Sequence, residues 1–215
     1  LLVQTDGSAD TERTVLHGAD LPLLDGLVLA PLALDADALR GRTDRSPLVL
    51  LGEHVGDPLF DHVTVDNEAA ARDATTHLLG QGRRRIAAIG AQATGPNETA
   101  MMRLTGYRQA LAEAGLAADD ELVAHVDRFH RTDGAAAMER LLTAADPPDA
   151  VFCFSDALPT GALRTLATHG LRVPEDVAVV GIDAVEEGLF HTPSLTTIAP
   201  DKPALARAAI ELLLR

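Results

Sequence analysis

The feature that most constrains the fold is a regular alternation of short apolar runs, rich in β-branched residues, with longer helical patterns. Such runs suit strands buried on both faces, and the alternation predicts an α/β fold with parallel sheets flanked by helices. The expected strands are residues 1–4, 26–29, 48–51, 62–65, 86–89, 122–126, 150–154 and 177–182. The expected helices, bounded by capping residues, prolines and glycines, are residues 68–79, 102–114, 134–144, 159–169 and 203–214.

The chain divides into two β/α series, which predicts two lobes. Residues 1–95 are expected to form an N-terminal lobe and residues 96–193 a C-terminal lobe. Residues 194–215 are expected to supply a crossover and a final helix that returns toward the N-terminal lobe. Two α/β lobes joined in this way enclose a ligand cleft, and hinge closure around a small ligand is a common switching device.

Charge and composition limit the partners of these residues. The formal net charge is −14, which repels a phosphate backbone, so these residues are not expected to hold DNA themselves. The basic cluster Arg83 to Arg85 is interpreted as solvated charge at a helix-to-strand turn. No apolar run approaches the roughly 18 residues that span a bilayer. No basic-then-apolar leader opens the chain, but its start without Met leaves open a removed leader or a further domain.

Enzymatic chemistry is not indicated. The eight histidines form no H-E-x-x-H motif and no Cys/His metal spacing, and Ser155 does not stand in a G-x-S-x-G elbow. The loop from Gly90 to Gly95 follows an expected strand but lacks the Lys-Ser/Thr of a phosphate loop. Cys153 lies in an apolar run and is interpreted as a buried small hydrophobe. Neither a metal nor a cofactor is therefore expected.

Six segments then carry a family resemblance. They are V-D-N-E-A-A (65–70), H-L-L-G-Q-G-R-R-R-I-A-A-I-G (77–90), R-L-T-G-Y-R-Q-A-L-A-E-A-G-L (103–116), F-S-D-A-L-P-T-G-A-L (154–163), G-L-R-V-P-E-D-V-A-V-V-G-I-D (170–183) and T-P-S-L-T-T-I (192–198). In this order they resemble the effector-binding domain of the LacI/GalR family of bacterial transcription regulators. The match begins at what resembles the second strand of the family, without its DNA-binding headpiece.

The resemblance implies a two-lobed, periplasmic-binding-protein-like (type I) fold and a cytoplasmic repressor. Its partners would be a small sugar or related polar metabolite, a second copy of the chain, and operator DNA held through a headpiece that this chain lacks. Residues 68–79 and 50–65 are candidates for part of the homodimer surface. A secreted solute-binding protein of a sugar transporter remains the alternative, and a sugar-processing enzyme is a third.

Five candidate ligand residues follow from the residues and the resemblance together. Asp183 ends an apolar run, at the sheet edge where ligands bind, and can accept two hydroxyl hydrogen bonds or cap the next turn. Arg103 offers a planar fork of donors to an effector or to an interlobe salt bridge. Phe129 occupies the family's aromatic position, either against a sugar ring or in the core. Asn97 and Thr99 are candidate polar contacts or plain loop residues.

The sequence departs from the family pattern at two positions. Ser155 precedes Asp156 where the family has Asn-Asp, so a shorter hydroxyl replaces a carboxamide at this sixth candidate. Pro200 stands where some sugar-responsive members have a side-chain amide. These departures leave the particular effector open.

Overall fold

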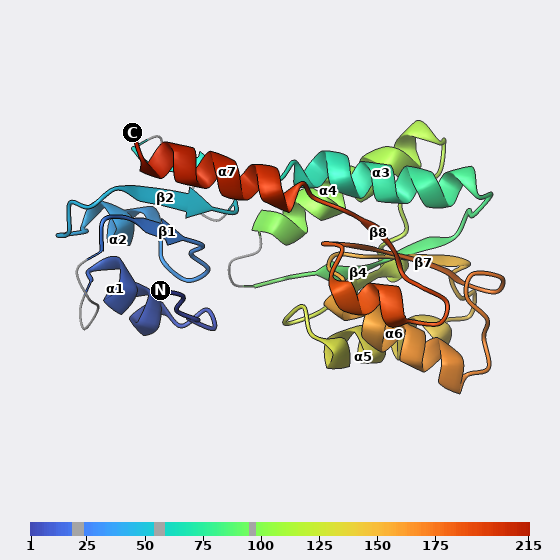
Figure 1. The fold of residues 1–215 in the computed structure, drawn as a ribbon. Helices are drawn as coiled ribbons and strands as arrows, with labels where there is room; N and C mark the ends of the chain where they lie inside the picture. The colour runs from blue at the N-terminus through green and yellow to red at the C-terminus, as the bar shows by residue number, and fades with distance from the viewer. Residues whose placement is uncertain (19–23, 54–58, 95–97) are drawn as a thin grey trace. The chain divides into compact units, whose positions relative to one another are not determined.

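The computed structural model describes residues 1–18, 24–53, 59–94 and 98–215 (Figure 1). The chain forms two compact units, one of Leu1–Val65 with Asp201–Arg215 and one of Asp66–Pro200. The sequence pattern predicts a boundary near residue 95, and this prediction is wrong. Residues 66–95 belong to the second unit, because helix α3 (Asn67–Gly80) packs along α4 (Glu98–Glu113) and strand β4 (Ile86–Ala91) lies within the second unit's sheet.

The first unit is a three-stranded parallel sheet between helices. Its strands run in the order β1 (Leu27–Leu29), β2 (Leu48–Leu51) and β3 (Asp61–Val63). Helices α1 (Ala9–Leu16) and α2 (Ala36–Arg40) pack on one face, and α7 (Lys202–Leu213) packs on the other (Figure 1). The last helix therefore belongs to the same unit as the N-terminal residues.

Two details of the first unit differ from the sequence prediction. Helices α1 and α2 were not predicted, although Ser8 and Asp35 each cap a helix by accepting a backbone N–H three residues later. Residues 1–4, predicted as a strand, pair with no strand within the described part of the chain, and Leu1 and Leu2 are exposed. A three-residue apolar run without a described partner strand has no ladder to join.

The second unit is a five-stranded sheet whose strands are all parallel. Their order is β5 (Val123–His125), β4, β6 (Ala150–Cys153), β7 (Ala178–Ile182) and β8 (Thr196–Ile198). Helices α3 and α4 cover one face, while α5 (Arg131–Leu142) and α6 (Ala157–Thr168) cover the other (Figure 1). The short 3₁₀ helices η1 (Asp120–Leu122) and η2 (Glu186–Phe190) precede β5 and follow β7. The prediction of a parallel α/β fold is confirmed.

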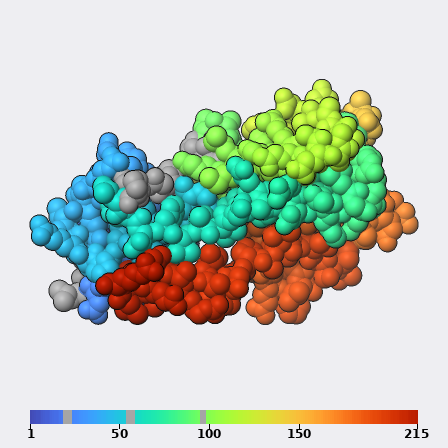
Figure 2. Space-filling view, turned by 90° about the horizontal axis from the view of Figure 1, so that it is seen from above, coloured from blue at the N-terminus to red at the C-terminus, as the bar shows by residue number. Residues whose placement is uncertain are grey.

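Close backbone contact fixes the two helix pairs. Figure 2 shows α3 and α4 side by side on the surface of the second unit. A Cβ atom at Gly106 of α4 would lie 2.1 Å from the carbonyl oxygen of Glu68 at the start of α3. On the other face, a Cβ atom at Gly134 of α5 would lie 2.1 Å from a backbone oxygen of α6, and one at Gly161 of α6 would lie 1.8 Å from a backbone oxygen of α5. Glycine at these positions lets each helix pair pack more tightly than any larger residue would allow.

Candidate functional site

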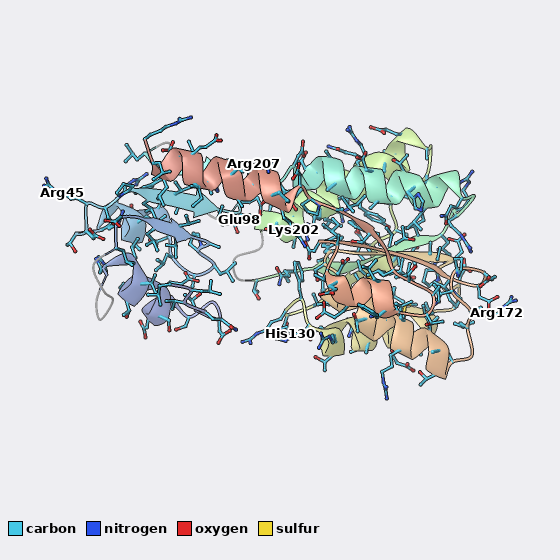
Figure 3. The ribbon with its side chains drawn as sticks, viewed as in Figure 1. Arg45, Glu98, His130, Arg172, Lys202 and Arg207 are labelled. Atoms are coloured by element: carbon cyan, nitrogen blue, oxygen red, sulfur yellow. The ribbon has the colours of Figure 1, made fainter. Side chains whose placement is uncertain are left out.

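The candidate ligand residues gather at one edge of the five-stranded sheet. Because all five strands are parallel, their carboxyl ends meet at the same edge, where open α/β sheets bind ligands. Phe129 follows β5, Ser155 follows β6 and Asp183 directly follows β7, as the sequence predicts. In Figure 3, His130 at the start of α5 marks this edge of the unit, and Arg172, which precedes β7, lies at the opposite edge.

Arg103 lies on α4, and its side chain reaches this carboxyl edge. The residue is only 7% exposed. Its Nε donates to Oδ1 of Asn67 at 2.6 Å, and its Nη1 donates to the carbonyl oxygen of Phe154. Its Nη2 lies 4.0 Å from Oδ1 of Asp183. A charge this deeply buried requires such partners, because its desolvation is otherwise costly.

Asp183 occupies a strained turn. Its φ is 120°, and φ of the next residue, Ala184, is 48°, values that residues with a Cβ seldom adopt. The backbone N–H of Asp183 donates to the carbonyl oxygen of Ile198 at 3.0 Å, which anchors the turn to β8. The side chain is 39% exposed, and 4.0 Å is longer than a direct hydrogen bond to Arg103. Backbone strain of this kind clusters at ligand sites.

The side chain of Asp156 binds the turn after β7 by hydrogen bonds, a role that the sequence does not reveal. The residue is 1% exposed. Its Oδ2 accepts the backbone N–H of Val185 at 3.0 Å, and its Oδ1 accepts the hydroxyl of Thr197 at 2.7 Å. A Cβ atom at Gly181 would lie 2.2 Å from Asp156 Oδ1, so the carboxylate fills the space above that glycine. The carboxylate thus links the ends of β6, β7 and β8.

Ser155 has the least usual environment of the candidates. It is 6% exposed, and its Oγ is the buried side-chain polar atom that lacks a hydrogen-bond partner within the described part of the chain. It follows Phe154, whose carbonyl oxygen accepts from Arg103. Buried hydroxyls without partners are rare because their desolvation is uncompensated. A polar ligand atom at this edge would supply the partner.

The remaining candidate residues are Phe129, Thr99 and Asn97. Phe129 is half-buried and packs against the main hydrophobic core of its unit. Thr99 is half-buried in the first turn of α4, which begins at Glu98, four residues before the predicted start at 102. Asn97 lies outside the described residues. The structure thus brings Arg103 and Asp183 together, with Ser155 beside the Phe154 carbonyl that Arg103 contacts.

The other polar and reactive side chains of the described residues do not indicate a metal site or a reactive cysteine. Over the described ranges, no group of three or more His, Cys, Asp or Glu side chains could hold a metal ion. Cys153 is fully buried, as predicted, and burial raises the pKa of its thiol. The guanidinium groups of Arg83 and Arg85 donate to the backbone carbonyls of Asp149 and Asp146, respectively, so the interpretation of this cluster as simply solvated charge is wrong for these two residues. None of the described helices could cross a membrane.

Comparison with known proteins gives a consistent family assignment. Residues 75–215 match the model of the periplasmic binding protein-like domain family. The HTH-type transcriptional repressor CytR of Escherichia coli K12 is 38% identical over 206 residues. That match covers 94% of this chain and 59% of CytR, so the chain spans about three fifths of this relative's length.

Solved structures agree with this match. The structure of a protein assigned to the LacI family of transcriptional regulators, from Sanguibacter keddieii DSM 10542, is 48% identical with a TM-score of 0.89. That match covers 100% of this chain and 76% of that one. The complex of the transcriptional regulator CelR with cellobiose is 35% identical with a TM-score of 0.81, over 96% of this chain and 63% of CelR.

Proposed function

Because the chain belongs to the LacI family of transcriptional regulators, we propose that it is the effector-binding core of a ligand-responsive repressor. The predicted periplasmic-binding-protein-like (type I) fold, with two parallel sheets flanked by helices, is that of its relatives. The matched proteins are transcription regulators, which favours this function over a secreted solute-binding protein and over an enzyme.

The proposed effector is a small sugar or a related polar metabolite. The observation that carries this proposal is the buried Ser155 hydroxyl, which has no partner among the described residues and lies beside the buried contacts of Arg103 at the carboxyl edge of the sheet. A sugar hydroxyl can accept from a guanidinium and donate to a carboxylate, so Arg103 and Asp183 suit one polyol. Phe129 would contact the apolar face of a sugar ring, with Thr99 and Asn97 as further polar contacts. A related regulator, CelR, binds cellobiose, which supports this class of effector.

The proposed mechanism is thermodynamic linkage. An effector that prefers one conformation of the core changes the operator affinity of an attached headpiece by the same coupling free energy. The net charge of −14 makes the core itself a poor partner for DNA, so we assign operator binding to a headpiece outside these residues, in the cytoplasm. The first residues of the full-length gene product test this assignment. A helix-turn-helix with a basic surface supports it, and a leader peptide supports the secreted alternative.

Effector binding is tested by thermal denaturation of the chain with a panel of sugars that includes cellobiose and ribose. A sugar that binds only the native state must raise the melting temperature. Isothermal titration should then show that Arg103→Ala and Asp183→Ala each weaken binding of that sugar by about 30-fold or more. Arg172→Ala is the matched control, because this exposed arginine lies at the opposite edge of the sheet. Wild-type affinity in both site variants contradicts the assigned site.

We also propose that the core forms a homodimer, because regulators that bind two-fold operators need matched headpieces. Helix α3 and residues 50–65 remain the candidates for part of the contact surface. Sedimentation at tens of micromolar should show a dimer, since a dimer of micromolar affinity is populated there. A monomer at this concentration contradicts the proposal.

A further inference from the structure

Asn67 is a buried polar residue outside the set proposed above to contact the effector. It is 2% exposed and lies at the start of α3. The chain enters the second unit at Asp66, so Asn67 is the first buried residue after the chain passes between the units. Its Oδ1 accepts the Nε–H of Arg103 at 2.6 Å. The start of α3 is therefore bonded directly to a residue of the candidate site.

This hydrogen bond constrains the direction of the whole Arg103 side chain. A guanidinium is planar and presents its donors in a rigid fork. Asn67 holds Nε and the Phe154 carbonyl holds Nη1, so two points of the plane are fixed by elements far apart in sequence. The direction of Nη2, which lies 4.0 Å from Asp183, follows from those two contacts.

The neutral amide at this position also matters for the charge of the site. Asp66 already caps α3 by accepting the N–H of Ala69 at 2.9 Å, so the helix start does not depend on the Asn67 side chain as its cap. A carboxylate in place of the Asn67 amide would lie 2.6 Å from Arg103 Nε and would compete with Asp183 for the guanidinium. An amide oxygen orients the cation without neutralising it.

We propose that Asn67 is a positioning residue for effector recognition, which sets the plane of the Arg103 guanidinium so that Nη2 faces the effector beside Asp183. This inference rests on the proposed function, because Asn67 acts through Arg103. It makes the start of α3 a part of the effector-binding site.

A first experiment needs no effector. Hydrogen exchange of the Arg103 Nε–H is measured by ¹⁵N NMR in the wild type and in Asn67→Leu, a variant of similar shape that has no acceptor. Exchange should be at least about tenfold faster in the variant, because the Nε–H has lost its acceptor. The matched control is Thr75→Val on the same helix, since the buried Thr75 hydroxyl donates to its own helix at Ala71. Equal exchange in the wild type and Asn67→Leu overturns the proposal.

A double-mutant cycle then tests binding, with cellobiose and ribose as the probes. Asn67→Leu should weaken binding about tenfold in the wild-type background and less than about twofold in Arg103→Ala, because its effect passes through Arg103. Equal losses in both backgrounds overturn the positioning role. Asn67→Ala replaces Asn67→Leu throughout if the latter lacks the wild-type circular dichroism spectrum.

The experiments distinguish an error in the effector site from an error in the positioning role of Asn67. If Arg103→Ala binds the sugars like the wild type, the effector site is misassigned. If Arg103→Ala weakens binding and Asn67→Leu does not, only the role of Asn67 is wrong. If the wild type binds neither sugar, the exchange measurement decides whether Asn67 orients Arg103.

Discussion

Ser155 and Asp156 are adjacent and both buried, yet truncation to alanine should change the stability of the protein in opposite directions. Ser155 is only 6% exposed, and its buried hydroxyl has no partner among the described residues. Burial of an unpaired hydroxyl costs about 1–3 kcal/mol. Ser155→Ala recovers this cost but loses the packing of one oxygen atom. The free energy of unfolding should therefore stay the same or rise by about 1 kcal/mol.

Asp156→Ala has the opposite expectation. The variant loses two hydrogen bonds to a carboxylate, each of about 1.5–3 kcal/mol, and leaves the Val185 N–H and the Thr197 hydroxyl without that partner. Relief of the buried charge offsets part of the loss. The net decrease in the free energy of unfolding should be about 3 kcal/mol. The turn that carries Asp183 loses one of its two anchors, so sugar affinity should fall as well.

Urea denaturation and isothermal titration measure both effects. Ser155→Ala should combine wild-type or higher stability with sugar binding at least about fivefold weaker, because a hydroxyl reserved for a ligand stabilises only the complex. This opposition of stability and affinity is typical of binding sites. A decrease in stability of more than about 1 kcal/mol in Ser155→Ala would show that the hydroxyl is already paired, which refutes the reasoning.

Three further predictions concern packing and ionisation. Gly161→Ala places a Cβ 1.8 Å from a carbonyl oxygen of α5 and should lower the free energy of unfolding in urea by about 3 kcal/mol. Gly80→Ala meets nothing within 4 Å and should raise it by about 0.5 kcal/mol, so equal effects would contradict the packing of α5 on α6. The side chain and backbone N–H of Arg172 lower the pKa of Asp176 from 3.8 to about 2. Asp176 therefore stabilises the fold above about pH 4 and loses this effect as the pH falls through about 2, so the melting-temperature difference between the wild type and Asp176→Asn should shrink over that range. The buried Cys153 thiol should resist a thiol reagent at pH 8 in the native protein, and labelling as fast as in urea would contradict its burial.

The sequence by itself determined the α/β class, strands β4 to β7 and helices α3 to α6 of the second unit, and the place of Asp183 at the end of β7, but it did not reveal β8. These features follow from local periodicity, and from the rule that parallel strands present their carboxyl ends at one edge. The local sequence pattern did not reveal α1, because this helix is held in place by contacts that are distant in sequence. The carboxylate of Glu12 on α1 is fully buried and accepts the backbone N–H groups of Leu32, Ala33 and Leu34, about twenty residues away.

Only the tertiary structure decided which sheet α3 joins. An amphipathic helix between two β/α series can pack on either one, and the contact of Gly106 with the start of α3 places it with α4. The same holds for the roles of Asn67 and Asp156. Asn67 and Arg103 are 36 positions apart, and Asp156 and Thr197 are 41 apart, so no local pattern couples them. Side-chain partnership across such distances is set by how the strands and helices pack, because a hydrogen bond forms only where folding brings its donor and acceptor within about 3 Å.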